Sequence, residues 1–192
     1  MNNIESHPLT PFLPPRARLL MLGSFPPQQK RWCMDFYYPN FQNDMWRILG
    51  FIFFADKNHF VDPEAKTFRK DDIVDFLSSE GIAIFDAATS VRRLQDNASD
   101  KYLEIVEPTD IGLLLRHIPE CRTIVTTGQK ATDTLCERFA LRQPAVGGFS
   151  AFATEGRDMR LYRMPSSSRA YPLALEKKAA FYRQMFRDIG IL

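Results

Sequence analysis

The chain has 192 residues, of which 45% are apolar and 25% are charged, the composition of an ordinary globular protein with a sizeable core. The formal net charge is only +2, so any electrostatic attraction to nucleic acid would have to come from local clusters of basic residues. Three cysteines without CxxC spacing argue against a disulfide framework, and the longest apolar run, residues 51–55, is too short to span a membrane. We therefore expect a reduced, cytoplasmic protein.

The first predicted elements are an arm, a strand and a turn. Residues 1–17 are polar and rich in proline, and we expect them to form an extended arm on the surface. The apolar run Leu19–Leu22 then has the length of a buried strand. It stops at residues 23–27, GSFPP, where a glycine and two prolines predict a rigid turn.

An aromatic loop follows this turn and leads into a helix. The loop ends at Asn43 and Asp44, either of which can cap a helix that begins near Met45. The apolar face of this helix has the i, i+3, i+4, i+7 spacing, in Met45, Ile48, Leu49 and Ile52. Because open α/β sheets place ligands where a strand feeds such a turn, we expect the aromatic loop to form one wall of a site.

The rest of the chain alternates between helices and strands in the same way. The sequence first predicts a polar connection over 56–70, a helix from Asp71 that Gly81 ends, a strand over 82–85, a long loop over 87–100 and a helix over 111–118. It then predicts a strand over 122–127, a helix from residue 129 to Phe139, an irregular segment over 142–156, a strand over 159–164 and a last helix over 175–189.

This alternation predicts the fold class. Strands that alternate with helices form a mainly parallel sheet, because right-handed crossovers place the helices on its two faces. We expect one three-layer α/β/α domain over residues 18–192 with a four-stranded central sheet. The turns at residues 23, 86, 127 and 165 should gather along one edge of that sheet.

Two segments resemble a known family. GSFPP at residues 23–27 and YYPNFQNDMW at residues 37–46 resemble the first motif of the uracil-DNA glycosylase superfamily. The hypoxanthine-DNA glycosylase branch is the most similar, since there GSFPS is followed by a segment of the form YYGHPRNAFW. Later matches are the sequence IAIFD at residues 82–86, the tripeptide Asp-Asn-Ala at residues 96–98 and the sequence MPSSS at residues 164–168. The last of these is similar to an LPSTSPA-type second motif.

The resemblance, which extends roughly from Arg18 to Phe186, implies a reaction on DNA. A damaged base is flipped out of the duplex, and its N-glycosidic bond to deoxyribose is hydrolysed. The residues implied to bind the base are Gly23, Ser24, Phe25, Pro26, Tyr37, Tyr38, Asp86 and Met164. Of the two tyrosines, we expect Tyr38 to stack on the base and the other to pack against the sheet, although both can equally be packing aromatics.

Two implied positions depart from the family pattern. Phe25 stands where other branches have an aspartate or an asparagine, so its side chain cannot orient a water molecule. Met164 stands where the most familiar branch has a histidine that stabilises the departing uracil anion. We therefore expect slower action on uracil than in that branch, or better action on hypoxanthine.

Asn43 is the catalytic residue that the resemblance implies. It aligns with the asparagine of the NAFW segment, and its amide oxygen would orient the attacking water. A second interpretation stays open, because Asn-Asp before an amphipathic run is also a common helix N-cap.

Ser166, Ser167, Ser168 and Arg169 are the implied DNA contacts. Hydroxyl groups and backbone amides bind phosphate, and Arg169 would add charge or enter the gap that the base leaves. The alternative is an ordinary serine-rich loop before a helix. Further candidates for phosphate contacts are Lys30, Arg31, Arg92, Arg93 and Lys101.

We expect no metal and no cofactor. The sequence has no HExxH, GxGxxG, GxxxxGK[ST] or GxSxG motif. The function that we expect is that of a monomeric, monofunctional DNA glycosylase of base excision repair that acts on deaminated bases, hypoxanthine or uracil. The alternatives are a catalytically inert DNA-binding module of the same fold and a hydrolase of free nucleosides.

Overall fold

A five-stranded sheet forms the centre of the molecule in the computed structural model, which describes residues 4–95 and 100–192. Its strand order is β5-β2-β8-β10-β9. The strands are β2 (Leu19–Gly23), β5 (Ile82–Asp86), β8 (Thr123–Thr127), β9 (Phe149–Thr154) and β10 (Arg157–Met164). The first four in the spatial order are parallel and β9 is antiparallel, so the predicted mainly parallel sheet is confirmed.

The fifth strand corrects the predicted count of four. β9 lies in the segment 142–156, which the sequence predicts as irregular, and it pairs with β10 through a tight hairpin. The hairpin turns at Glu155 and Gly156, with φ of 50° and 68°, and two residues of positive φ match the twist of the flanking strands. Its residues alternate between exposed and half-buried, as expected for an edge strand.

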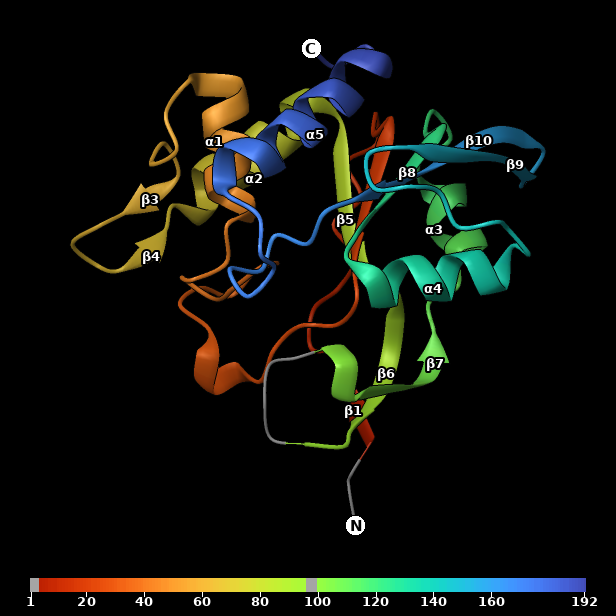
Figure 1. Ribbon diagram of the computed structural model, residues 1–192, viewed down its shortest axis with the longest axis horizontal. Coiled ribbons are helices and arrows are strands. Elements are labelled where there is room, and N and C mark those ends of the chain that lie inside the picture. Colours follow the sequence, from red (N-terminus) through yellow and green to blue (C-terminus); the bar gives the residue numbers. More distant parts are fainter. Residues whose placement is uncertain (1–3, 96–99) are drawn as a thin grey trace.

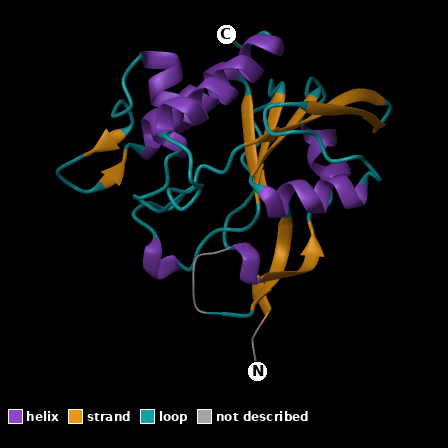
Figure 2. Ribbon diagram, viewed as in Figure 1, coloured by secondary structure: helices purple, strands orange, loops and turns teal. Residues whose placement is uncertain are grey.

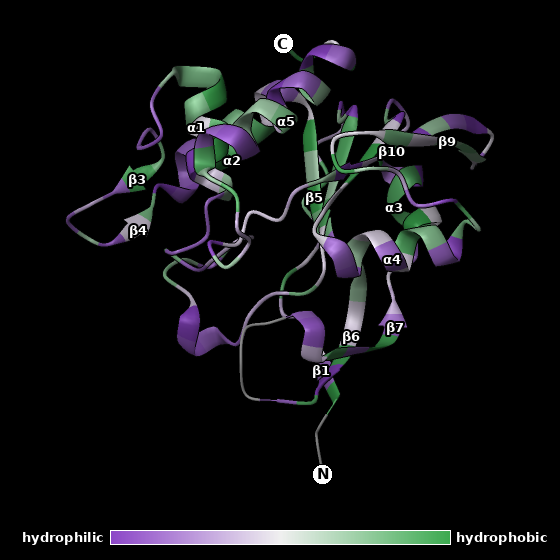
Figure 3. Ribbon diagram, viewed as in Figure 1, coloured by the Kyte–Doolittle hydropathy of each residue, from purple (hydrophilic) through white to green (hydrophobic). Residues whose placement is uncertain are grey.

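Helices cover both faces of this sheet, as Figures 1 and 2 show. One face carries α1 (Met45–Phe54), α2 (Lys70–Glu80) and α5 (Leu175–Asp188), and the other carries α3 (Ile111–His117) and α4 (Gln129–Arg138). Colouring by hydropathy shows apolar strands at the centre and polar residues on the outer sides of the helices (Figure 3). This amphipathic pattern is the one that the apolar periodicity predicts.

The helix ends follow local sequence signals. Gly81 ends α2 in the left-handed conformation, with φ of 69°, which confirms the predicted cap. Asp110 caps α3, because its carboxylate accepts a hydrogen bond from the Leu113 N–H at 3.1 Å. At α1 the side chain of the N-cap residue, Asp44, makes no capping hydrogen bond, and Oδ1 of the preceding Asn43 instead accepts from the Met45 N–H at 2.9 Å.

A second, antiparallel sheet of three strands lies beyond the carboxyl ends of the central strands. It consists of β1 (Ile4–Ser6), β6 (Ala88–Arg93) and β7 (Leu103–Pro108), in the order β1-β6-β7. The predicted loop over 87–100 therefore begins as a strand. A small hairpin of β3 (Val61–Asp62) and β4 (Thr67–Phe68) interrupts the predicted polar connection over 56–70.

The described part of the predicted arm, residues 4–17, is fixed to the sheets by backbone hydrogen bonds. β1 pairs with β6, and Phe12 exchanges two backbone hydrogen bonds with Ile84 of β5, at 3.0 and 2.9 Å. The arm therefore lies against the outer edge of β5.

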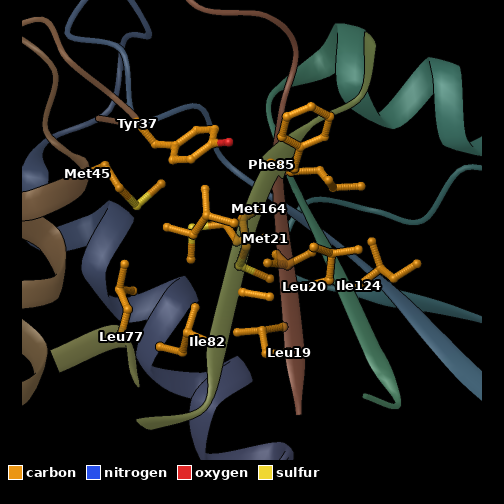
Figure 4. Close-up of a cluster of buried hydrophobic side chains, with 14 of the residues drawn as sticks. Leu19, Leu20, Met21, Tyr37, Met45, Leu77, Ile82, Phe85, Ile124 and Met164 are labelled. Atoms are coloured by element: carbon orange, nitrogen blue, oxygen red, sulfur yellow. The ribbon is translucent and has the colours of Figure 1, made fainter. Parts of the chain in front are cut away.

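The core lies between the central sheet and its helices. Leu19–Leu22 of β2 are completely buried, and side chains from β2, β5, β8 and α1 pack together around them (Figure 4). Within residues 4–95 and 100–192, no helix has both the length and the apolar character needed to cross a bilayer.

Candidate active site

A pocket of about 280 Å³ lies at the carboxyl ends of the parallel strands. The register of β2 and β5 places Gly23 beside Asp86, and the ends of β8 and β10 bring Thr127 and the serine loop 166–169 to the same edge. The turn 23–27 also lines the pocket. Two segments about 140 residues apart in the chain therefore line one cavity, where open α/β sheets bind their ligands.

Most of the predicted site residues line this pocket, and one does not. Those that line it are Gly23, Ser24, Phe25, Pro26, Tyr37, Tyr38, Asn43, Asp86, Ser166, Ser167, Ser168 and Arg169. Met164 is 1% exposed and belongs to the core beside Met21 (Figure 4), so it reaches the site only through its neighbours in the chain. Asp96, the first residue of the tripeptide Asp-Asn-Ala at 96–98, lies outside the described residues.

The backbone at Gly23 is in close contact with two pocket side chains. A Cβ atom at this position would overlap with Oδ1 of Asp86 and would lie 3.6 Å from the hydroxyl oxygen of Tyr38. Gly23 is therefore needed for the close approach of the Asp86 carboxylate, and Oδ1 of that carboxylate lies over the end of β2.

We predict that Gly23→Ala lowers stability by about 1–3 kcal/mol, because the added methyl group displaces a buried carboxylate. Urea denaturation measures this loss. In an Asp86→Ala background the overlapping oxygen is absent, so the same glycine substitution should cost much less. An equal cost in both backgrounds would contradict the assigned contact.

The two neighbouring tyrosines have different environments. Tyr37 is 2% exposed, its hydroxyl donates to the Thr10 carbonyl at 2.7 Å, and its ring packs edge-on against Phe85. Tyr38 is half-buried with φ of 48°, and its hydroxyl shares a hydrogen bond of 2.8 Å with Oγ1 of Thr127. Burial, and next the charge of Asp86, raise the pKa of Tyr38, so its phenol stays neutral.

Asn43 and Asp44 connect the start of α1 to the serine loop. Oδ1 of Asn43 accepts from the Met45 N–H, which leaves one lone pair and both amide hydrogens for other contacts. The Asp44 N–H donates to the Ser167 carbonyl at 2.9 Å. Its carboxylate accepts from Nζ of Lys178 at 3.2 Å and from Nε of Arg169 at 3.0 Å.

Contacts with α5 hold the serine loop in place. Nζ of Lys178 donates to the Ser168 carbonyl at 2.8 Å, and the Tyr182 hydroxyl donates to the Pro165 carbonyl at 2.9 Å. Inside the loop, Oγ of Ser166 accepts from the Ser168 N–H at 3.2 Å. The loop is thus built on buried helix contacts, and Arg169 remains half exposed at its end.

Asp100 also lines the pocket, although the sequence gives it no specific role. Burial raises the pKa of its carboxyl, the nearby Ser24 hydroxyl opposes this, and the charge of Asp86 raises the pKa further. The sequence signal that could have indicated a role for Asp100 is its position at the end of the loop 87–100, since long loops in compact domains are usually functional.

Two residues near the pocket make contacts that the sequence does not predict. Arg93, a candidate phosphate contact, is buried and donates to both carboxylate oxygens of Glu5 and to the Pro26 carbonyl, so it supports the turn from inside. His7, from the arm, places Nε2 2.8 Å from Oδ2 of Asp86. No pattern in the sequence indicates this contact between His7 and Asp86.

Comparisons with known proteins agree with the fold. No family model and no curated protein matches the sequence. Among solved structures, the chain is similar to the solution NMR structure of a protein from Methanosarcina acetivorans that is provisionally assigned as a uracil DNA glycosylase. The identity is 20%, the TM-score is 0.62, and the match covers 98% of this chain and 99% of the other. This likeness shows a shared α/β fold, with a mainly parallel sheet between helices.

Proposed function

We propose that this protein is a monofunctional DNA glycosylase that hydrolyses the N-glycosidic bond of a flipped-out deaminated base, hypoxanthine or uracil. Three findings support the proposal. GSFPP and YYPNFQNDMW resemble motifs of the uracil-DNA glycosylase superfamily, the M. acetivorans protein with the same fold carries a related assignment, and the pocket has a suitable place and size.

The observation that carries the proposal is the meeting of the turn 23–27 and the serine loop 166–169 around one cavity. Its volume of about 280 Å³ is just below the range of about 300–1,000 Å³ for drug-sized ligands. A single base fits this scale. A base that enters it must leave the duplex stack, which costs least for a mispaired base.

The proposed roles follow the geometry of the pocket. Tyr38 supplies a ring at the wall, on which the base would stack, and Oδ1 of Asp86 offers a hydrogen-bond acceptor for the edge of the base. Asn43 would orient the attacking water. The serine loop and the remaining N–H groups of Arg169 would bind phosphates, because guanidinium has five donors and only Nε of Arg169 donates to Asp44.

We propose hypoxanthine as the better substrate within this class. With Met164 in the core, no histidine stands at that position to stabilise a uracil anion. A purine can leave after its ring has been protonated, and the Asp100 carboxyl in the pocket wall is the candidate proton donor. The neutral amide of Asn43 is a weak base. It suits this reaction as the water-orienting group, because oxocarbenium character develops on the sugar before the water bonds.

The test is base release from duplex oligonucleotides that carry hypoxanthine, uracil, xanthine or a thymine mispair. We expect release of hypoxanthine to be the fastest, and strand cleavage to appear only after alkali treatment. Binding without release of any base would instead indicate an inert DNA-binding module. Activity on free nucleosides alone would indicate a nucleoside hydrolase.

A further inference from the structure

We infer that His7, carried into the site by the N-terminal arm, is a positioning residue that fixes the Asp86 carboxylate for recognition of the base. This inference rests on the proposed glycosylase function. It assigns a role in the site to a segment that lies outside every motif of the sequence.

The contact between the two side chains is short and buried. Nε2 of His7 lies 2.8 Å from Oδ2 of Asp86, and the side chains are 4% and 9% exposed. The other ring nitrogen, Nδ1, lies 2.9 Å from the Leu9 carbonyl oxygen and 3.1 Å from the Leu9 nitrogen. Both ring nitrogens therefore have partners, so the orientation of the imidazole is set.

Residues outside the arm hold His7 from several sides. The His7 N–H donates to the Thr89 carbonyl at 2.8 Å, directly after the pairing of β1 with β6. The imidazole ring packs 4.5 Å from the ring of Phe85 and 5.2 Å from that of Phe25, measured between centroids. Phe25 is itself a pocket residue, so the imidazole lies directly behind the pocket wall.

A second link from the arm reaches the turn 23–27. Glu5 accepts two hydrogen bonds from Nε of Arg93, at 3.0 and 2.9 Å, and the same guanidinium donates to the Pro26 carbonyl at 2.6 Å. The arm thus supports both the carboxylate of Asp86 and the turn that begins beside it. Two independent contacts from one short segment converge on the same pocket.

The histidine limits what Asp86 can offer to a base. Oδ2 is occupied by the imidazole, and Oδ1 lies over Gly23, so one fixed acceptor remains for one ring N–H. The N1–H of hypoxanthine has a C–H on one side, whereas the N3–H of uracil lies between two carbonyl oxygens that a carboxylate repels. A fixed Asp86 should therefore favour hypoxanthine, and a carboxylate free to rotate should discriminate less.

Three substitutions of His7 in the full chain separate its contacts. His7→Gln keeps a donor near the position of Nε2, so it retains the contact with Asp86. His7→Asn keeps only a polar group near the position of Nδ1, and His7→Phe keeps only the ring packing. His117→Gln, at an exposed histidine on α3, is the matched control.

We expect His7→Gln to release hypoxanthine within about 3-fold of the wild-type rate. For His7→Asn and His7→Phe we expect kcat to fall by on the order of 10-fold to 100-fold, the size of a lost hydrogen bond to a charged group. In the same two variants, the ratio of the hypoxanthine rate to the uracil rate should also fall. A general loss of folded protein would lower both rates equally and leave this ratio unchanged. Thermal unfolding identifies a variant that does not fold. If His7→Asn or His7→Phe fails to fold, the remaining one of these two is compared with His7→Gln.

Equal rates and equal base ratios in all three variants and the control would overturn the inference while leaving the proposed function intact. So would a loss in His7→Gln as large as that in His7→Asn. A wild-type protein that releases no base from any duplex would overturn the proposed function, and this inference with it.

Discussion

Replacement of Asn43 with alanine is expected to slow hypoxanthine release by on the order of 10²-fold to 10³-fold, the usual effect of removing a group that orients the reacting atoms. The side chain lines the pocket at the start of α1, and its oxygen has one lone pair beyond the bond to the Met45 N–H. Single-turnover release from a hypoxanthine duplex measures the loss, because product release then does not hide the chemical step.

The same side chain also caps α1, and a second substitution separates the two roles. Asn43→Ala removes the cap as well, at a cost of about 1 kcal/mol of stability. Asn43→Ser keeps a hydroxyl oxygen that can accept from the Met45 N–H, but it lacks the amide. We expect the serine variant to be stable and still slow. A serine variant with wild-type activity would limit Asn43 to its capping role.

Lys178→Ala should be the most destabilising substitution outside the apolar core, with a loss of about 3–5 kcal/mol. The Lys178 side chain is 1% exposed, and its Nζ binds both Oδ2 of Asp44 and the Ser168 carbonyl. Truncation leaves a buried carboxylate without its buried cationic partner and removes the hydrogen bond from α5 to the Ser168 carbonyl. Urea denaturation measures the loss, and base release should fall as well because the loop loses its support.

Two controls make this prediction specific. Lys177→Ala changes an exposed neighbour on the same helix and should leave stability within about 0.5 kcal/mol of the wild type. The double substitution Asp44→Asn with Lys178→Met removes both buried charges and should recover much of the stability, since hydrophobic replacement of a buried ion pair is often neutral. A double variant less stable than Lys178→Ala would show that the cost does not come from an unpaired charge.

Local signals predicted the elements that frame the site. Leu19–Leu22 is a short apolar run, and it is the buried strand β2. The i, i+3, i+4, i+7 spacing predicted α1 and α3 and the residues at which they begin, because an apolar stripe of that period can be buried only as a helix face. Gly81 ended α2 as expected, since the left-handed conformation costs glycine little.

The missed elements depend on contacts between distant parts of the chain. β6 follows β5 after one residue and pairs with the arm, about 85 residues earlier, so the sequence of 87–100 does not reveal its partner. The apolar residues of β9 do not mark a buried face, because Phe149, Ala151 and Ala153 are exposed at the edge of the sheet. Its signal was the dipeptide Glu155-Gly156, which provides a two-residue hairpin turn.

The same reasoning explains which site residues were found. The turn 23–27 and the serine loop contain glycine, prolines and serines in unusual runs, so the sequence itself marks them. His7 and Asp100 are single residues in ordinary polar surroundings, and only the folded chain brings them to Asp86 and the pocket. Met164 lies in a recognisable segment, yet the alternation of side chains along β10 turns it into the core.

The pairing of Phe12 with Ile84 has a consequence for solubility. An outer strand of a sheet presents unpaired N–H and C=O groups, which can pair with a strand of another molecule and begin aggregation. Here the arm takes up the N–H and C=O of Ile84 at the open side of β5. The segment that carries His7 therefore also protects the sheet against edge-to-edge association between copies of the chain.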